Sequence, residues 1–136
     1  MFRKIVIALS VVVLSLGAIT YIALEASDVA IAHTISRIGE PRATHIWFIE
    51  TDHGLILEAG HPDNPWITDL HAGSTLHVTI DSQRHEYETE FQSNRHTQIR
   101  EEMRRKYGWR DVWVGFLFDV SKSQRLIARK VNASPS

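Results

Sequence analysis

The first hydrophobic pattern along the chain is an unbroken apolar run near its N-terminus. Residues 5–24, IVIALSVVVLSLGAITYIAL, contain no charged side chain. At 1.5 Å per residue, a helix of about 20 residues spans a hydrocarbon core of about 30 Å. The run is longer than the apolar core of about 7 to 15 residues in a cleaved signal peptide. We therefore expect an uncleaved membrane anchor over residues 1–24, inserted through residues 5–24.

Charged residues on either side of this run predict its orientation. Arg3 and Lys4 precede the run, whereas Glu25 and Asp28 follow it. The positive-inside rule then places the N-terminus in the cytoplasm and the following domain outside, on the periplasmic side. Residues 25–38 mix small and apolar residues at loosely helical spacing, which predicts a juxtamembrane helix or linker.

Beyond residue 38 the apolar residues mostly alternate with polar ones or form short β-rich runs, a pattern typical of strands. Gly54 lies in the turn TDHG between two such runs and can adopt positive φ, which predicts a hairpin. The turn DSQR predicts a second hairpin with one wet face, in which His77 and His85 are expected to be cross-strand neighbours. The strand-like runs are residues 44–50, 55–59, 74–80, 85–92, 111–120 and 125–131.

Helical periodicity appears between the second hairpin and the last two strand-like runs. Ser93 or Asn94 can cap a helix that runs to about Tyr107. Ile99, Met103 and Tyr107 follow one another at i, i+4 and i+8, so they share one face of that helix. A second, shorter helix is expected near residue 65.

These elements predict the fold class of the domain. About six short antiparallel strands and two short helices over residues 39–131 cannot bury both faces of an open sheet. We therefore expect a mainly β domain that curls into a small barrel, followed by a tail over residues 132–136.

The stretch HPDNPWITDL, residues 61–70, allows two interpretations. Asn64 is a good N-cap and Pro65 suits the first helical position. In one interpretation Trp66 and Leu70 lie on one face and plug the end of the barrel. In the other, the free amides and positive dipole of the helix N-terminus bind a phosphate, although Asp63 opposes this by repulsion. The sequence leaves both open.

Composition excludes several classes of function. The chain has 15 basic and 16 acidic residues, so it has no net positive charge that would attract a polyanion, and we do not expect nucleic acid as a partner. It has no cysteine, so disulfides, thiol catalysis and cysteine metal sites are absent. The eight histidines form no His-x-x-x-His or His-Glu-x-x-His pair, and we expect no metal site. A Gly-x-Ser-x-Gly elbow is also missing.

The order of motifs over about residues 36–80 resembles the split β-barrel flavin and deazaflavin oxidoreductases, specifically the deazaflavin-dependent nitroreductase group. The family's Gly-x-Pro-Arg stretch and first long strand are matched by Gly39, Pro41, Arg42, Trp47 and Phe48. Its Trp-x-x-Asn-Leu-basic-Ala-Asn-Pro pattern is met in part by Trp66, Asp69, Leu70, His71 and Ala72. Here Gly73 and Ser74 replace Asn-Pro, and a histidine replaces the usual permanent cation.

The resemblance implies a cofactor and the residues that would hold it. The cofactor would be a deazaflavin coenzyme or FMN, with its phosphate on Arg37 and Arg42. The other cofactor-binding positions implied are Asn64, Trp66, Asp69 and His71. Tyr107 would help position the electron acceptor as the catalytic residue. The alternative is that Tyr107 and its aromatic neighbours Trp109 and Trp113 close the core.

Two hypotheses about function follow. In the first, a membrane-anchored split-barrel oxidoreductase passes a hydride from a reduced flavin or deazaflavin to a lipophilic acceptor, such as a quinone or a nitro compound. In the second, the domain is a non-enzymatic, cofactor-free split-barrel module that binds or assembles with partners outside the membrane. The resemblance also implies a homodimer.

Overall fold

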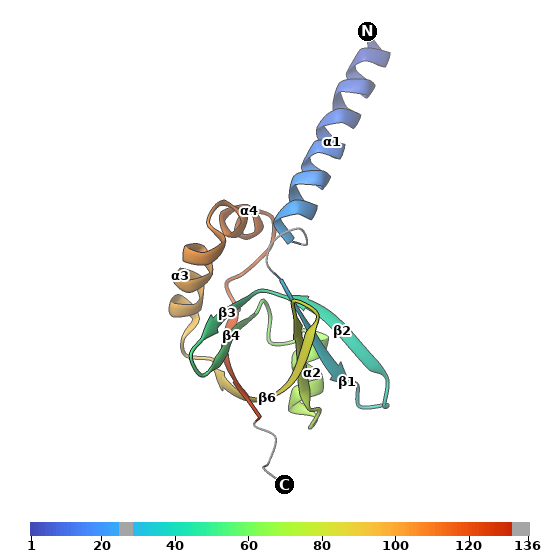
Figure 1. Cartoon of the computed structure of the whole chain (residues 1–136). Coiled ribbons are helices and arrows are strands. Elements are labelled where there is room, and N and C mark those ends of the chain that lie inside the picture. The colour runs from blue at the N-terminus through green and yellow to red at the C-terminus, as the bar shows by residue number, and fades with distance from the viewer. Residues whose placement is uncertain (25–28, 132–136) are drawn as a thin grey trace.

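A seven-stranded antiparallel sheet forms the body of the protein in the computed structural model, which describes residues 1–24 and 29–131 (Figure 1). Its strand order is β2-β1-β5-β6-β7-β4-β3. The strands are β1 (Ala30–Ile35), β2 (Pro41–Ile46), β3 (Phe48–Thr51), β4 (Gly54–Ala59), β5 (Leu76–Ile80), β6 (Gln83–Gln92) and β7 (Gln124–Lys130).

The sheet curls because its two edge strands are neighbours in the sequence. Strands β2 and β3 stand at opposite ends of the strand order, yet Trp47 alone separates them. The edges must therefore approach each other at this residue. This confirms the split-barrel fold expected from the sequence, although the single strand expected over residues 44–50 is two strands in the structure.

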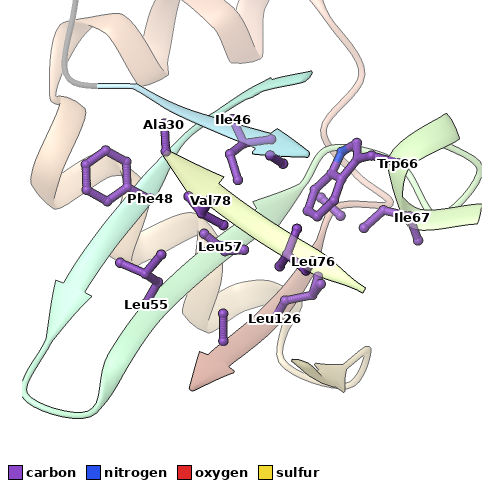
Figure 2. Packing of buried hydrophobic residues seen from close by; sticks show 13 residues of the cluster. Ala30, Ile46, Phe48, Leu55, Leu57, Trp66, Ile67, Leu76, Val78 and Leu126 are labelled. Carbon is purple, nitrogen blue, oxygen red and sulfur yellow. The ribbon is translucent and has the colours of Figure 1, made fainter. Parts of the chain in front are cut away.

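The barrel interior is filled by the inward positions of the strands and closed by a short helix (Figure 2). Leu57, Leu76 and Leu126 are among its fully buried side chains. Helix α2 (Pro65–His71) packs on the barrel and buries Trp66 and Ile67. Each large apolar side chain buried in this way stabilises the fold by about 1.5 to 3 kcal/mol.

Helix α3 (His96–Tyr107) forms a second, smaller core with the strand corner. Ile99, Met103 and Tyr107 are buried on one face, which confirms the predicted stripe. The Tyr107 ring stacks on Trp47 with 4.1 Å between centroids. The expected cap is wrong, because Arg95 occupies the N-cap position and no side chain makes a capping hydrogen bond.

The N-terminal helix stands apart from the barrel. Helix α1 (Phe2–Leu24) includes a segment, Phe2–Ala23, that is long and apolar enough to cross a membrane, with a mean hydropathy of 2.5. Most of its side chains are exposed, and Ala23 at its end is buried. It extends from the domain at the end where helix α4 (Trp109–Leu117) lies (Figure 1).

Two expectations about secondary structure are wrong. Residues 30–35 form strand β1 and not a helix or linker, because their small buried residues alternate with period two. Residues 36–38 of that segment belong to the turn before β2, and residues 25–28 and the tail over 132–136 lie outside the described residues. Within 111–120, residues up to Leu117 belong to α4 and not to a strand, because an apolar, aromatic run fits either element by periodicity alone.

Candidate functional site

Arg42 and Asp69, both matched to the split-barrel motifs, contact each other directly. The Nε of Arg42 on β2 donates to Oδ2 of Asp69 on α2 over 2.8 Å. Thr34 Oγ1 on β1 donates to the same oxygen over 2.7 Å. Burial opposes ionisation of Asp69, but the two hydrogen bonds hold the pKa of its carboxyl below the usual value. Asp69 is therefore a buried carboxylate that fixes Arg42 and joins α2 to the sheet.

A cavity of about 260 Å³, here named the basic cavity, lies beside Arg42. The described residues that line it include four basic side chains and no acidic one: His33, Arg42, His77 and Arg84, together with Thr34, Ile35, Pro41, Ala43 and Thr75. The strand register explains the grouping, because β1 lies between β2 and β5 and pairs His33 with His77. Arg84 on β6 pairs with Thr79, the neighbour that contacts His33 Nε2 at 2.8 Å.

The electrostatics of the basic cavity suit an anion. Burial, and then the charges of Arg84 and His77, lower the pKa of the His33 imidazole. Arg42 contacts Asp69 through Nε, and its terminal nitrogens donate no hydrogen bond to another described residue. A phosphate placed here would meet guanidinium donors and would offset the mutual repulsion of the basic groups.

A second cavity of about 410 Å³, the aromatic cavity, begins where the basic cavity ends on β2. Residues 41–43 line the first cavity and residues 44–47 line the second. Asn64 and Trp66 border it from the start of α2, and Val114 and Phe118 border it from α4 and the segment after it. The helix start that could bind an anion therefore lies in the aromatic cavity, and not with Arg42.

The remaining predicted site residues lie elsewhere. Arg37 is exposed in the turn between β1 and β2. His71 ends α2 and stacks on Phe91, with 4.4 Å between ring centroids. Tyr107 is buried, and its hydroxyl accepts a hydrogen bond from the backbone N–H of Phe48 over 3.1 Å. These contacts give Tyr107 a place in the core, as the alternative interpretation expected, whereas Trp109 is half-exposed.

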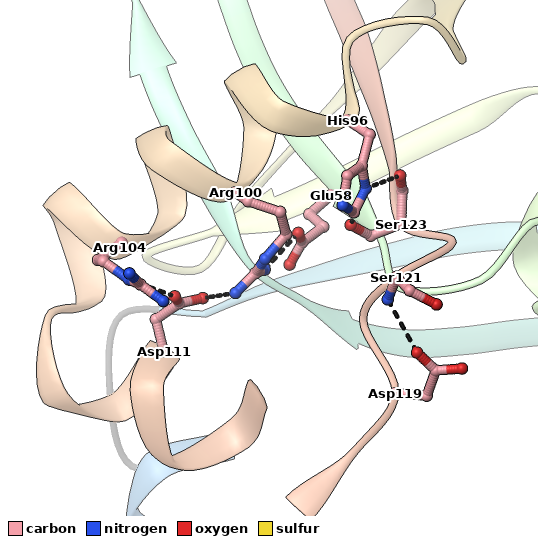
Figure 3. A network of polar contacts seen from close by, with 8 residues as sticks. All are labelled: Glu58, His96, Arg100, Arg104, Asp111, Asp119, Ser121 and Ser123. Atoms are coloured by element: carbon pink, nitrogen blue, oxygen red, sulfur yellow. Dashed lines mark hydrogen bonds and ion pairs between the residues drawn. The ribbon is translucent and has the colours of Figure 1, made fainter. Parts of the chain in front are cut away.

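Glu58 brings an ionisable group to the aromatic cavity from β4 (Figure 3). Its carboxylate accepts a hydrogen bond from Arg100 of α3 over 2.5 Å, and Arg100 also donates to Asp111 of α4. Burial raises the pKa of Glu58, although Arg100 opposes this effect. The three side chains connect β4, α3 and α4, so they hold two helices and one wall of the aromatic cavity in place.

Sequence reasoning missed His33, His77, Arg84 and Glu58. The first three are brought together by the pairing of β1 with β5, whose residues are more than forty positions apart in the sequence. No local sequence pattern indicates that these two strands are neighbours. The expected pairing of His77 with His85 is wrong, because the turn contains only Asp81 and Ser82, both at positive φ. The register instead pairs His77 with Glu86. Among the described residues no three potential ligands gather to hold a metal ion.

No family model and no curated protein sequence matches the chain. Solved structures do match, at low identity. An F420 reductase has a TM-score of 0.57 and 11% identity, with 82% of this chain and 93% of that chain covered. The heme storage protein HutZ from Vibrio cholerae has a TM-score of 0.57 and 10% identity, with 86% and 90% covered. A candidate pyridoxamine 5′-phosphate oxidase from Lactobacillus delbrueckii gives 0.53 and 9%, with 81% and 86% covered.

These likenesses define the class of the protein by its fold. The chain has the split-barrel fold of the pyridoxamine-phosphate-oxidase type, which it shares with proteins named for F420, heme and pyridoxamine 5′-phosphate. Because each identity is far below 25%, the likeness carries the fold alone and leaves the nitroreductase group as a proposal.

Proposed function

We propose that this chain is a membrane-anchored split-barrel oxidoreductase that holds the phosphate of FMN or of a deazaflavin coenzyme in the basic cavity. The observation that carries the proposal is the charge of that cavity. After Arg3 and Lys4 are set aside, the chain has 15 − 2 = 13 basic and 16 acidic residues, a net −3. On the same count of permanent charges, the cavity is lined by two arginines and no acidic described side chain, with His33 and His77 beside them, so it is a local departure from an acidic domain, as phosphate binding requires.

The aromatic cavity supplies room for the ring. The basic cavity, at about 260 Å³, suits a phosphate but is smaller than the roughly 300 to 1,000 Å³ of usual cofactor sites. The adjoining cavity of about 410 Å³ has Trp47, Trp66 and Phe118 in its lining. Three residues of an extended strand cover about 10 Å, so β2 connects a phosphate subsite to a ring subsite at a separation that a ribityl phosphate tail can bridge.

When bound, a flavin or deazaflavin supplies the hydride-transfer chemistry. The chain's own residues have three tasks. Arg42 and Arg84 hold the phosphate, and Asp69 keeps the Arg42 guanidinium in position. The aromatic walls exclude water from the reacting face. Glu58, whose carboxylate pairs with Arg100, holds one wall of the same cavity in place.

The apolar helix α1 favours the hypothesis that the electron acceptor is lipophilic, such as a quinone or a nitro compound. An anchor that crosses the membrane through residues 5–24 would keep the aromatic cavity close to molecules dissolved in the bilayer. A single-pass topology with the N-terminus in the cytoplasm belongs to this proposal, as does a homodimer.

A specific observation favours the second candidate function, a cofactor-free binding module. A bound phosphate would need the positive charge of Arg42, but Asp69 already neutralises that charge in the ion pair. If that pair is purely structural, the basic cavity has only Arg84 as an uncommitted permanent cation among its lining residues.

A titration of the chain of residues 1–136 in detergent, with FMN and with the deazaflavin coenzyme, distinguishes the two functions. Binding is measured by fluorescence quenching. Arg84→Gln should weaken binding at least about tenfold, or about 1.4 kcal/mol. Arg42→Ala should weaken it similarly, and Arg129→Gln, which alters an exposed pair with Glu90, is the matched control. Unchanged affinity in Arg84→Gln contradicts the phosphate site, and no binding by folded wild type favours the module.

A further inference from the structure

The outer face of α4 is apolar and open to its surroundings. Trp109, Val112 and Phe116 are 52%, 54% and 83% exposed. Leu117 and the following Phe118 are also exposed, and a hollow of about 520 Å³ lies among the side chains of this face. Contiguous aromatic surface of this kind on a small domain marks a place where something else binds.

This apolar face is continuous with the apolar N-terminal helix. Trp113 of α4 donates its indole Nε1–H to Thr20 Oγ1 of α1 over 3.0 Å. Figure 1 shows α4 beside the last turns of α1, at the end of the barrel from which α1 leaves the domain. This hydrogen bond places α4 beside Thr20, and so defines the position of α4 along the axis of α1.

That height corresponds to the boundary of a bilayer. Thr20 lies three residues before Ala23, where the apolar segment ends, and so about 4.5 Å inside that end. Helices that lie in the membrane interface bury their apolar face about 5 to 10 Å into the region between headgroups and acyl chains. A membrane crossed by α1 would therefore reach the exposed side chains of α4.

The residue types on and beside α4 match the same boundary. Tryptophan is enriched at membrane interfaces because an apolar ring carries one polar N–H. Arg105, in the last turn of α3 immediately before α4, is an exposed cation, and Arg104 beside it is also exposed but pairs with Asp111 over 3.7 Å. The Arg110 guanidinium lies 5.1 Å from the centroid of the Trp109 ring. Basic groups beside an aromatic face are attracted to anionic lipid headgroups.

We infer that α4 is an interfacial helix whose face of Trp109, Val112, Phe116 and Leu117 inserts into the surface of the bilayer that α1 crosses. The occupant of this face is lipid. Val114 and Phe118 also line the aromatic cavity, so the inserted helix would place the mouth of that cavity against the membrane. The inference rests on the proposal that α1 spans the membrane, and it specifies the route of the lipophilic acceptor.

The absence of cysteine in the sequence makes a site-specific test direct, because a single introduced cysteine takes a spin label at one position only. We would label Phe116→Cys on α4, Val12→Cys within α1 and Lys130→Cys at the end of β7. In Figure 1 the red final strand runs toward the side of the barrel opposite to α1. All three side chains are exposed, so the substitutions spare the core. The full chain would be reconstituted in vesicles of phosphatidylcholine and phosphatidylglycerol.

Accessibility to oxygen, which partitions into lipid, is compared with accessibility to a water-soluble nickel complex. We expect the ratio at position 116 to exceed that at position 130 by about fivefold or more and to stay below that at position 12, since position 116 would lie at the membrane boundary and position 12 near the centre of the apolar segment. A lipid-like ratio at position 12 with a water-like ratio at position 116 overturns the interfacial helix and leaves the anchor intact.

Two further outcomes also count against the inference. A water-like ratio at position 12 overturns the anchor and the interfacial helix together, without bearing on cofactor binding, which the titration measures separately. Low accessibility to both reagents at position 116 with dipolar broadening between labels would show that a second copy of this chain, and not lipid, covers the face.

Discussion

Asp69 and Asp111 are both buried and both held by arginine, but they serve different parts of the molecule. Asp69 accepts hydrogen bonds from Arg42 and Thr34 at the edge of the basic cavity. Asp111 has no exposed side-chain surface and pairs with Arg100, between α3 and α4. Removal of either partner of a buried ion pair leaves the other charge buried and uncompensated. The loss in stability is far larger than the stabilisation that an exposed ion pair provides.

Asp111→Asn should therefore destabilise the protein strongly. Arg100 would keep only Glu58 as its partner, and we expect a loss of about 3 kcal/mol in the free energy of unfolding. Urea denaturation of the full chain in detergent, followed by circular dichroism, measures it. Glu90→Gln, which removes one partner of the half-exposed pair with Arg129, is the matched control and should cost less than about 1 kcal/mol. Equal effects of the two variants would contradict a structural role for the buried pair.

His33 should couple cofactor binding to pH. Its pKa is below 6.5 because burial and the charges of Arg84 and His77 disfavour the proton. A bound phosphate offsets those charges and raises that pKa, so affinity for FMN should increase as pH falls through the His33 titration. Nuclear magnetic resonance of the imidazole with and without FMN, together with dissociation constants from about pH 5 to pH 8, tests this.

The same lowered pKa predicts the sign of a stability change in the ligand-free protein. The unfolded chain takes up the His33 proton at higher pH than the folded chain, so stability falls as pH drops below about 6.5. His33→Gln should flatten this part of the stability profile, whereas His53→Gln, in the exposed β3–β4 turn, should leave it unchanged. For the binding experiment described before, an affinity of the wild-type protein for FMN that does not change with pH would contradict a phosphate beside His33.

At the level of elements, the sequence predicts what depends on near neighbours. The stripe of Ile99, Met103 and Tyr107 and the alternation of Leu76 with Val78 are local, and both were predicted correctly. The run at 111–120 was not, because its aromatic and β-branched residues favour a strand intrinsically and only its contacts with α3 and α1 make it helical.

The candidate site was predictable only in part for the same reason. Arg42 and Asp69 could be selected from a motif, but their direct contact joins β2 to α2 across 27 positions. The basic cavity needs β1 beside β5, and the sequence offered a helix or linker in place of β1. Non-local strand pairing therefore limited the prediction of both the fold and the site.

Gly54, at the start of β4, should not tolerate a side chain. Its φ is +151°, and a Cβ there would lie 2.1 Å from the carbonyl oxygen of Ala128 on β7. Gly54→Ala must therefore separate β4 from β7 or strain the turn, and we expect a loss of about 2 to 3 kcal/mol on chemical denaturation. Gly60→Ala, where the nearest atom is 3.8 Å away, is the control. Comparable stabilities of the two variants would contradict the close approach.

The whole molecule combines an apolar helix, a barrel and a helix beside the end of α1, and the proposed topology can be tested in cells. Arg3 and Lys4 favour a cytoplasmic N-terminus. In intact cells Lys130→Cys should react with a membrane-impermeant maleimide, because the barrel would face outward. A cysteine placed at Phe2 should be protected until the cells are lysed. The opposite pattern would put the barrel in the cytoplasm, where reduced deazaflavin is expected.

The position of β7 has a consequence for how the protein is made. β7 pairs with β6 on one side and with β4 on the other, and Leu126 is matched with Leu57, 69 positions earlier. During synthesis α1 and six strands emerge before the strand that joins the two parts of the sheet. Until residues 124–130 emerge, the edges of β4 and β6 would therefore stay unpaired, and such edges pair readily with other chains. Completion of the sheet thus depends on the last strand to be synthesised.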